Sequence, residues 1–239
     1  MKIYYLDNSG FALELGHALM IFDCWSFPLR EQNKHFDKGY LEENALPGYT
    51  RVYFFVSHIH GDHFNQKIFE VAGQNTFYVL DSAIPTPDGI AAVHMSPGDT
   101  FEDGFIKVRA WPSTDTGVSF QVEAMGKTIF HAGDLNYWHW QQESTPQEIE
   151  EARAGFEAAL DSIDGHMGRP DAAFFPVDPR MEKNYELGAE EFILRYNPRV
   201  FIPMHFSNRF EVPHAFQQRM EGKCTVFAPK KRGDLFVTE

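Results

Sequence analysis

Hydrophobic residues in the first half of the chain occur in short runs separated by turn-forming residues, a pattern typical of β-strands. Three of the turns are marked by Asn8-Ser9-Gly10, Ser96-Pro97-Gly98-Asp99 and Met125-Gly126-Lys127. The pattern predicts strands at residues 3–6, 11–15, 19–23, 51–57, 77–80, 105–111, 118–124 and 128–132. Segment 27–47 is polar and weakly patterned, and we expect it to form an insertion or a flap over the surface.

The second half of the chain mixes strands with helices. Apolar residues recur at helical spacing over 146–163, and Thr145, Pro146 and Glu148 supply an N-cap, a first helical position and a capping box. The pattern predicts further helices at 189–196 and 213–221 and strands at 172–177, 200–204 and 224–228. Two sheets packed face to face with helices outside would use all these elements, so we expect an α/β sandwich. Without a repeat or linker, residues 1–239 are predicted to form a single domain.

Composition and charge narrow the possible partners. Hydrophobic residues make up 43% of the chain and charged residues 23%, as in ordinary globular proteins. The net charge of −13 disfavours binding to nucleic acid or to anionic membranes, so we expect a small-molecule substrate. The start of the chain lacks a signal-peptide core and no apolar run approaches membrane-spanning length, which predicts a cytoplasmic protein. Dimers are common for domains of this size, so a homo-oligomer stays open.

The two cysteines, Cys24 and Cys224, lie far apart in the sequence. They permit neither a disulfide framework nor a CxxC zinc motif. We expect each of them to be a small, buried hydrophobic residue.

Residues 57–64, Ser-His-Ile-His-Gly-Asp-His-Phe, bring three histidines and an aspartate into six positions. They follow the apolar run 52–56, which reads as a buried strand. Residues two apart in an extended chain point the same way, so His58 and His60 can aim at one point. The alternative is a polar loop that happens to be rich in histidine. Crowded coordinating side chains at the end of a strand favour metal binding.

The same segment can supply a second metal position. We expect Gly61 to let the backbone turn sharply. Asp62 and His63 would then follow at the start of a helix and aim at a neighbouring point. One short segment therefore predicts ligands for two adjacent metal ions.

Two further candidate ligands stand at the ends of predicted strands. Asp134 follows Gly133 at the exit of one strand, where its carboxylate could bridge two cations; alternatively it is a turn aspartate. His205 ends the apolar run 200–206, and sites in such sheets form at carboxyl edges. Taken alone, His205 could be a core histidine.

These motifs resemble those of the metallo-β-lactamase superfamily. The residues are His58-Ile59-His60-Gly61-Asp62-His63, Gly133-Asp134 and Pro203-Met204-His205, in the same order and at similar spacing over nearly the whole chain. The first motif is highly specific, whereas the other two are weak alone. The resemblance implies a four-layer αββα sandwich with a dinuclear site on one edge. It is strongest with the short, single-domain hydrolases, such as the ascorbate-phosphate lactonase-like group.

One feature of the superfamily is missing. Relatives usually carry another histidine before the Gly-Asp motif, but the matching region here, 111–118, reads Trp-Pro-Ser-Thr-Asp-Thr-Gly-Val. Asp115 is the obvious replacement, although the segment could also be a plain turn. An additional carboxylate shifts metal preference toward manganese or iron, while zinc stays the default.

The resulting expectation is a hydrolase with two divalent metal ions that share a hydroxide and attack a small ester, lactone or phosphodiester. The expected ligands are His58, His60 and Asp115 for the first ion, Asp62, His63 and His205 for the second, and Asp134 as the bridge. Asp62 could also orient the hydroxide. His139 could line the substrate pocket or donate a proton; alternatively, it lies among aromatic residues of a loop without a catalytic role.

Further candidates lie near these positions. Arg180 either binds an anionic substrate group or pairs with Asp178, and we favour the pair. Trp138 and Trp140 could form the wall of a pocket.

A non-hydrolytic di-iron redox or sensing protein on the same fold is the alternative function. Redox proteins with this layout typically have glutamate where His60 stands here, so His60 favours hydrolysis.

Overall fold

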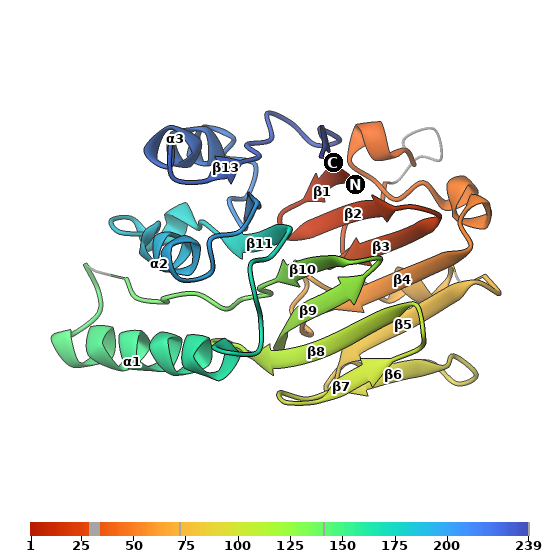
Figure 1. The fold of residues 1–239 in the computed structure, drawn as a ribbon, viewed down its shortest axis with the longest axis horizontal. Coiled ribbons are helices and arrows are strands. Elements are labelled where there is room, and N and C mark those ends of the chain that lie inside the picture. The colour runs from red at the N-terminus through yellow and green to blue at the C-terminus, as the bar shows by residue number, and fades with distance from the viewer. Residues whose placement is uncertain (29–33, 72, 141, 239) are drawn as a thin grey trace. The chain divides into compact units, whose positions relative to one another are not determined.

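The computed structural model describes residues 1–28, 34–71, 73–140 and 142–238. The chain forms two compact units, and each contains one seven-stranded mixed sheet (Figure 1). The first unit comprises Met1–Met95 and Pro229–Glu239, and the second comprises Ser96–Ala228. The first unit therefore contains both ends of the chain. The single domain over 1–239 stays a prediction.

The sheet of the first unit has the order β14-β1-β2-β3-β4-β5-β6. Its strands are β1 (Lys2–Asp7), β2 (Gly10–Leu15), β3 (Ala18–Phe22), β4 (Arg51–Val56), β5 (Thr76–Asp81), β6 (Ala92–Met95) and β14 (Leu235–Val237). Strands β3 to β6 pair in parallel, and the remaining pairs are antiparallel. The parallel strands end at one edge of the sheet, where polar residues follow them.

The sheet of the second unit has the order β13-β12-β11-β10-β9-β8-β7. Its strands are β7 (Thr100–Glu102), β8 (Ile106–Pro112), β9 (Val118–Ala124), β10 (Lys127–His131), β11 (Ala172–Pro176), β12 (Val200–Met204) and β13 (Thr225–Val226). Strands β10 to β13 pair in parallel. This sheet also has its polar strand ends at one edge.

Three α-helices belong to the second unit: α1 (Pro146–Ile163), α2 (Leu187–Tyr196) and α3 (Glu211–Arg219). The capping box of α1 is confirmed, because Thr145 and Glu148 hydrogen-bond each other's backbone amide groups. Buried Phe156, Leu160 and Ile163 form its inward face. A further short 3-10 helix, η5, spans Pro179–Met181.

The α/β class and the two mixed sheets are confirmed. The three strands not predicted are β6, β7 and β14, which span only three or four residues each. Such short runs carry too few apolar positions to show a period. Within the described residues, no helix is both long enough and apolar enough to cross a bilayer.

The expectation of a surface flap at 27–47 is wrong for much of the segment. It forms two 3-10 helices, η2 (Phe36–Lys38) and η3 (Glu43–Gly48). Phe36, Leu41 and Leu46 are buried in the core of the first unit. Widely spaced apolar residues anchor this segment, and such spacing resembles a polar loop in the sequence. Residues 29–33 lie outside the described residues.

The two cysteines differ in burial. Cys24 is buried as expected, and burial raises the pKa of its thiol to about 12. For Cys224 the expectation is wrong, because it is only partly buried where the short strand β13 begins.

Candidate metal centre

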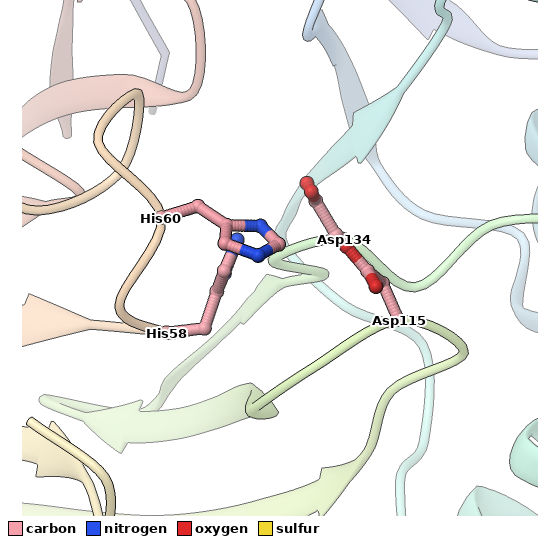
Figure 2. A group of neighbouring side chains, drawn as sticks. All are labelled: His58, His60, Asp115 and Asp134. Carbon is pink, nitrogen blue, oxygen red and sulfur yellow. The ribbon is translucent and has the colours of Figure 1, made fainter.

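The histidine-rich segment begins where β4 ends, at Val56. His58 and His63 are fully buried, whereas His60 is exposed. The ring centroids of His58 and His60 are 4.7 Å apart, and those of His58 and His63 are 4.0 Å apart. Figure 2 shows His58 and His60 side by side, with ligand nitrogens within 4.8 Å of each other. The segment therefore gathers its imidazoles as the strand-end pattern predicted.

The local backbone differs from the sequence expectation. No α-helix starts at Asp62; residues 61–63 form a turn, in which the His63 amide donates to the His60 carbonyl at 3.0 Å, and the 3-10 helix η4 (Gln66–Phe69) follows. Gly61 is not among the residues with positive φ, and a Cβ there would meet open space. The turn itself thus does not require glycine.

Asp23 organises this cluster, and the sequence analysis missed it. It follows β3 and is 1% exposed. One carboxylate oxygen accepts from the Ser57 amide at 2.8 Å, and the other accepts from the Ser57 hydroxyl and lies 2.7 Å from His63 Nδ1. The Ser57 hydroxyl in turn lies 3.0 Å from His58 Nδ1. These contacts orient both rings and leave Nε2 as the coordinating atom of each.

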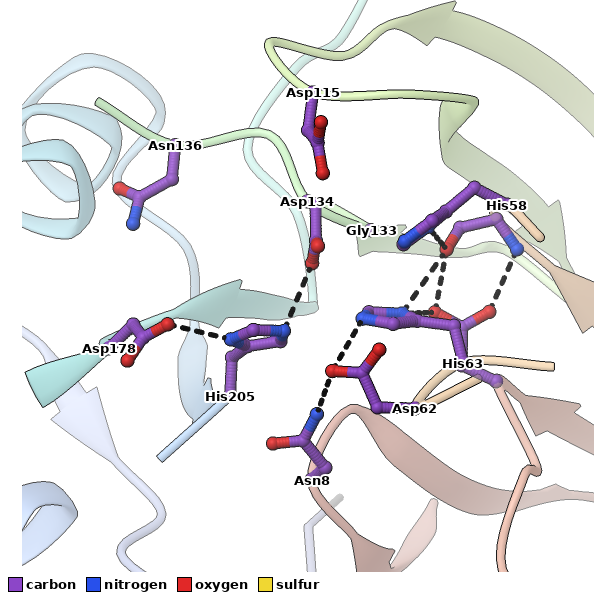
Figure 3. A network of polar contacts seen from close by, with 12 residues as sticks. Asn8, His58, Asp62, His63, Asp115, Gly133, Asp134, Asn136, Asp178 and His205 are labelled. Atoms are coloured by element: carbon purple, nitrogen blue, oxygen red, sulfur yellow. Dashed lines mark hydrogen bonds and ion pairs between the residues drawn. The ribbon is translucent and has the colours of Figure 1, made fainter. Parts of the chain in front are cut away.

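Asp62 lies beside His63 in the same unit (Figure 3). Its Oδ2 is 3.8 Å from His63 Nε2 and accepts a hydrogen bond from Asn8 Nδ2 at 3.1 Å. The Asp62 side chain is 44% exposed, in contrast to the buried His63. Asn8 is a second residue that the sequence analysis read only as part of a turn.

In the second unit, Asp134 follows β10 and Gly133, whose φ of 54° lies in the left-handed region that glycine favours. Asp115 is exposed in the β8–β9 connection. A carboxylate oxygen of Asp115 lies within 4.8 Å of one of Asp134. Thr114 joins the two loops, because its hydroxyl donates to the Asn136 carbonyl at 2.6 Å. The structure therefore brings these two carboxylates together.

His205 is the third candidate ligand of the second unit. It follows β12 with an unusual φ of 63°, and its Nε2 lies 3.5 Å from Asp134 Oδ1. Its Nδ1 lies 2.9 Å from Asp178 Oδ2, at the end of β11 (Figure 3). Arg180 Nε donates to the same oxygen at 2.8 Å, so the predicted Asp178–Arg180 pair is confirmed. Asp178 also orients a candidate ligand, which the sequence analysis did not anticipate.

Charge at Asp178 follows from its partners. Burial alone would raise the pKa of its carboxyl, but hydrogen bonds from His205 and Arg180 outweigh that effect and lower the pKa below its ordinary value. Asp178 is therefore an anion that fixes the His205 ring from behind.

His139 and two tryptophans lie in the loop after Asp134. His139 is buried, with Nδ1 3.1 Å from the Tyr137 carbonyl, which requires Nδ1 to be the donor. Trp138 donates from Nε1 to the Asp134 carbonyl at 2.7 Å, and its ring meets the His205 ring at 5.9 Å. Trp140 stacks on Trp138 and is 41% exposed.

The donor sets fit divalent transition metals. Imidazole and carboxylate are the donors that zinc, manganese and iron accept. Buried Nε2 atoms of His58, His63 and His205 lie opposite Nδ1 atoms held by serine or carboxylate partners. This carboxylate–histidine arrangement is the usual support of a metal-bound imidazole.

Comparison with known sequences finds metal-dependent hydrolases. No family model matches the chain. A UPF0173 metal-dependent hydrolase from Pyrococcus abyssi is 28% identical over 199 residues, which cover 75% of this chain and 79% of that protein. A UPF0173 metal-dependent hydrolase from Thermoplasma acidophilum is 26% identical over 181 residues, 70% of each chain.

Solved structures share the fold. Igni18, a metallo hydrolase from Ignicoccus hospitalis, has a TM-score of 0.64 at 18% identity and covers 100% of this chain and 99% of its own. The metallo-β-lactamase fold protein YhfI from Bacillus subtilis has a TM-score of 0.62 at 12% identity, over 98% of both chains. CmlA, a diiron β-hydroxylase from Streptomyces venezuelae, has a TM-score of 0.57 at 10% identity and covers 95% of this chain but 52% of its own. At such identities the similarity concerns the fold alone.

Proposed function

We propose that this chain belongs to the metallo-β-lactamase superfamily and is a metal-dependent hydrolase of small esters, lactones or phosphodiesters. One observation carries the proposal: each unit presents imidazole and carboxylate donors at the edge where its parallel strands end, supported from behind by buried partners. The sequence relatives named above carry the name of metal-dependent hydrolases, which agrees with this reading.

We assign the donors to two metal ions as the sequence pattern suggests. On the sequence pattern alone, His58, His60 and Asp115 would hold the first ion, Asp62, His63 and His205 would hold the second, and Asp134 would serve both. When bound, a pair of such cations would supply a hydroxide at neutral pH and would stabilise the oxyanion of the transition state. Zinc is the default, and the three carboxylates also favour manganese or iron.

The chain's own residues would position the reactants. Asp62 would orient the attacking water through its carboxylate oxygen. Because the Nδ1–H of His139 is engaged by a carbonyl, its Nε2 is an acceptor that can take up the proton released by the attacking water and pass it to the leaving group. The exposed face of Trp140, stacked on Trp138 beside His205, offers an apolar wall for the substrate. We further propose a cytoplasmic enzyme with a small-molecule substrate and no nucleic-acid or membrane partner.

The di-iron redox alternative is less well supported. CmlA shares the fold, but its 10% identity carries no function to this chain. The imidazole of His60 favours hydrolysis, as the sequence pattern indicated. A strong iron charge-transfer band in protein purified without oxygen, together with no hydrolysis of any ester, would reverse this order.

The proposal is tested by metal analysis combined with a panel of a phosphodiester, a phosphomonoester, a lactone and a thioester. We expect two divalent ions per chain and hydrolysis of at least one substrate. The double variant D62A/H63A should lose at least a thousandfold in kcat/KM, because two ligands of one ion are removed. D115A should lower the metal content. Wild-type activity in D62A/H63A would rule out the proposed chemistry.

A further inference from the structure

The turn between β1 and β2 is buried, which is unusual for a hairpin turn. Asn8 and Ser9 form this two-residue connection, and they are 5% and 0% exposed. Asn8 has a φ of 51°, in the left-handed region that asparagine tolerates better than most residues. Turn formation alone would permit glycine here, so a buried asparagine calls for another reason.

The side-chain amide of Asn8 supplies that reason. Its Nδ2 donates to Asp62 Oδ2 at 3.1 Å (Figure 3). Rotating the amide by half a turn would set its oxygen against the carboxylate, two acceptors facing each other, so the donor orientation is the only one compatible with an ionised Asp62. The Asn8 Oδ1 atom is buried and receives no hydrogen bond within the described part of the chain. The hydrogen bond that the Asn8 side-chain amide makes is therefore the one to Asp62.

The backbone around Asn8 is held rigidly. Its amide nitrogen donates to the Tyr5 hydroxyl at 3.0 Å. On the preceding residues, Arg232 donates from Nε to the Leu6 carbonyl at 2.8 Å and pairs through Nη1 with Asp7 at 3.0 Å. The last turn of the chain therefore fixes the loop that carries Asn8.

Asp62 needs such a partner more than the buried candidate ligands do. His58, His63 and His205 are buried and oriented by serine or carboxylate groups, whereas the Asp62 side chain is 44% exposed. An exposed aspartate samples several rotamers, which lowers the fraction of time spent in a coordinating geometry.

We infer that Asn8 is a positioning residue that holds the Asp62 carboxylate in its metal-coordinating orientation. The inference rests on the proposed function, because it gives Asp62 a metal to bind. Partners of this kind typically contribute ten- to a hundredfold to metal affinity or activity.

Three substitutions of Asn8 distinguish the effect of losing its side-chain amide from the effect of straining its backbone. N8G removes the amide but suits the left-handed conformation, so metal-free N8G should unfold at or above the wild-type temperature. N8D keeps the shape but cannot donate to Asp62 and adds a like charge beside it. N8A removes the amide and strains the backbone, so its unfolding temperature should fall. The measurement is zinc binding by metal-free protein in competition with a chelating dye.

We expect N8G to weaken the second zinc equivalent about ten- to a hundredfold, and N8D to weaken it at least as much. The hydrolytic kcat should fall more than KM changes. In a D62A background, adding N8G should change zinc binding no further, since the amide then has nothing to orient. Wild-type zinc affinity in both N8G and N8D, or an N8G effect that persists without Asp62, would overturn the inference. Failure of the proposed function is a different result: the wild-type protein would bind no zinc.

Discussion

At the residue scale, buried aspartates contact the Nδ1 atoms of two candidate imidazole ligands, opposite the Nε2 atoms that would coordinate a metal. Asp23 holds His63 and Asp178 holds His205, both through Nδ1. Neither aspartate forms part of a recognisable metal motif, yet each fixes the tautomer and the direction of a candidate ligand. Ligand motifs in a sequence therefore identify the candidate ligands but not the residues that orient them.

Replacing Asp178 tests this role. D178N keeps the shape but removes the anion, and we expect metal affinity to fall about ten- to a hundredfold. R180Q is the matched control, since the Arg180 side chain is 58% exposed and its loss leaves the Asp178–His205 contact in place. R180Q should change metal affinity less than threefold. A chelator titration measures both, and wild-type affinity in D178N would contradict the role. A raised KM in R180Q alone would instead indicate binding of an anionic substrate group.

At the element scale, the candidate functional residues follow adjacent parallel strands. In the second unit, β10, β11 and β12 pair in parallel and are followed by Asp134, Asp178 and His205. In the first unit, β3 and β4 are parallel and are followed by Asp23 and the histidine segment. The carboxyl ends of parallel strands share an edge, which explains why residues far apart in sequence converge.

Two glycines in helices should respond oppositely to the same substitution. In α1, a Cβ at Gly155 would meet open space, so G155A should stabilise the protein by about 0.5–1 kcal/mol. In α2, a Cβ at Gly188 would collide with Asn136 Oδ1, and Asn136 is buried two residues after Asp134. G188A should therefore destabilise by about 1–3 kcal/mol and lower activity. Urea unfolding measures both; equal signs would show that α2 does not constrain the Asp134 loop.

At the scale of the whole molecule, the last residues of the chain complete the first unit. Strand β14 pairs with β1, and Arg232 lies 4.1 Å over the Tyr40 ring and donates to the Gly39 carbonyl. A Cβ at Gly39 would collide with Arg232, so the two segments approach as closely as glycine allows. Asp7, the ion-pair partner of Arg232, is buried.

Removing Arg232 should therefore lower the unfolding free energy, because the buried Asp7 carboxylate would lose its cation. Burial raises the pKa of the Asp7 carboxyl despite the attraction of Arg232. R232Q leaves Asp7 without its cation, and we expect a loss of about 3 kcal/mol in unfolding free energy at pH 7. Because the folded-state pKa of Asp7 lies above its unfolded value, the charge penalises folding above that pKa, and the loss should shrink as pH falls through the carboxyl range.

Two controls accompany R232Q in chemical unfolding experiments. D7N/R232Q should recover part of the stability, because no buried charge remains. R209Q removes an exposed ion pair with Glu211 and should leave stability unchanged. An R232Q variant as stable as the wild-type protein would show that the C-terminal segment does not anchor the Asn8 loop.

The sequence by itself determined most strands and the three α-helices of the described residues, and it selected seven candidate metal ligands that stay a prediction. It could do so because buried strands and amphipathic helices have their own periods and because clustered histidines after a buried strand are improbable without a ligand. Asp134 and His205 also stood at the ends of apolar runs, and the structure places their side chains 3.5 Å apart.

Only the tertiary structure decided what supports these residues. Asn8, Asp23 and Asp178 act on partners 54, 40 and 27 positions away in the chain. In the sequence they appear as a turn asparagine and two strand-end aspartates, because a hydrogen bond between distant segments leaves no local period. The buried apolar residues of 34–47 and the C-terminal strand β14 escaped prediction for the same reason: their partners, not their neighbours, fix their conformation.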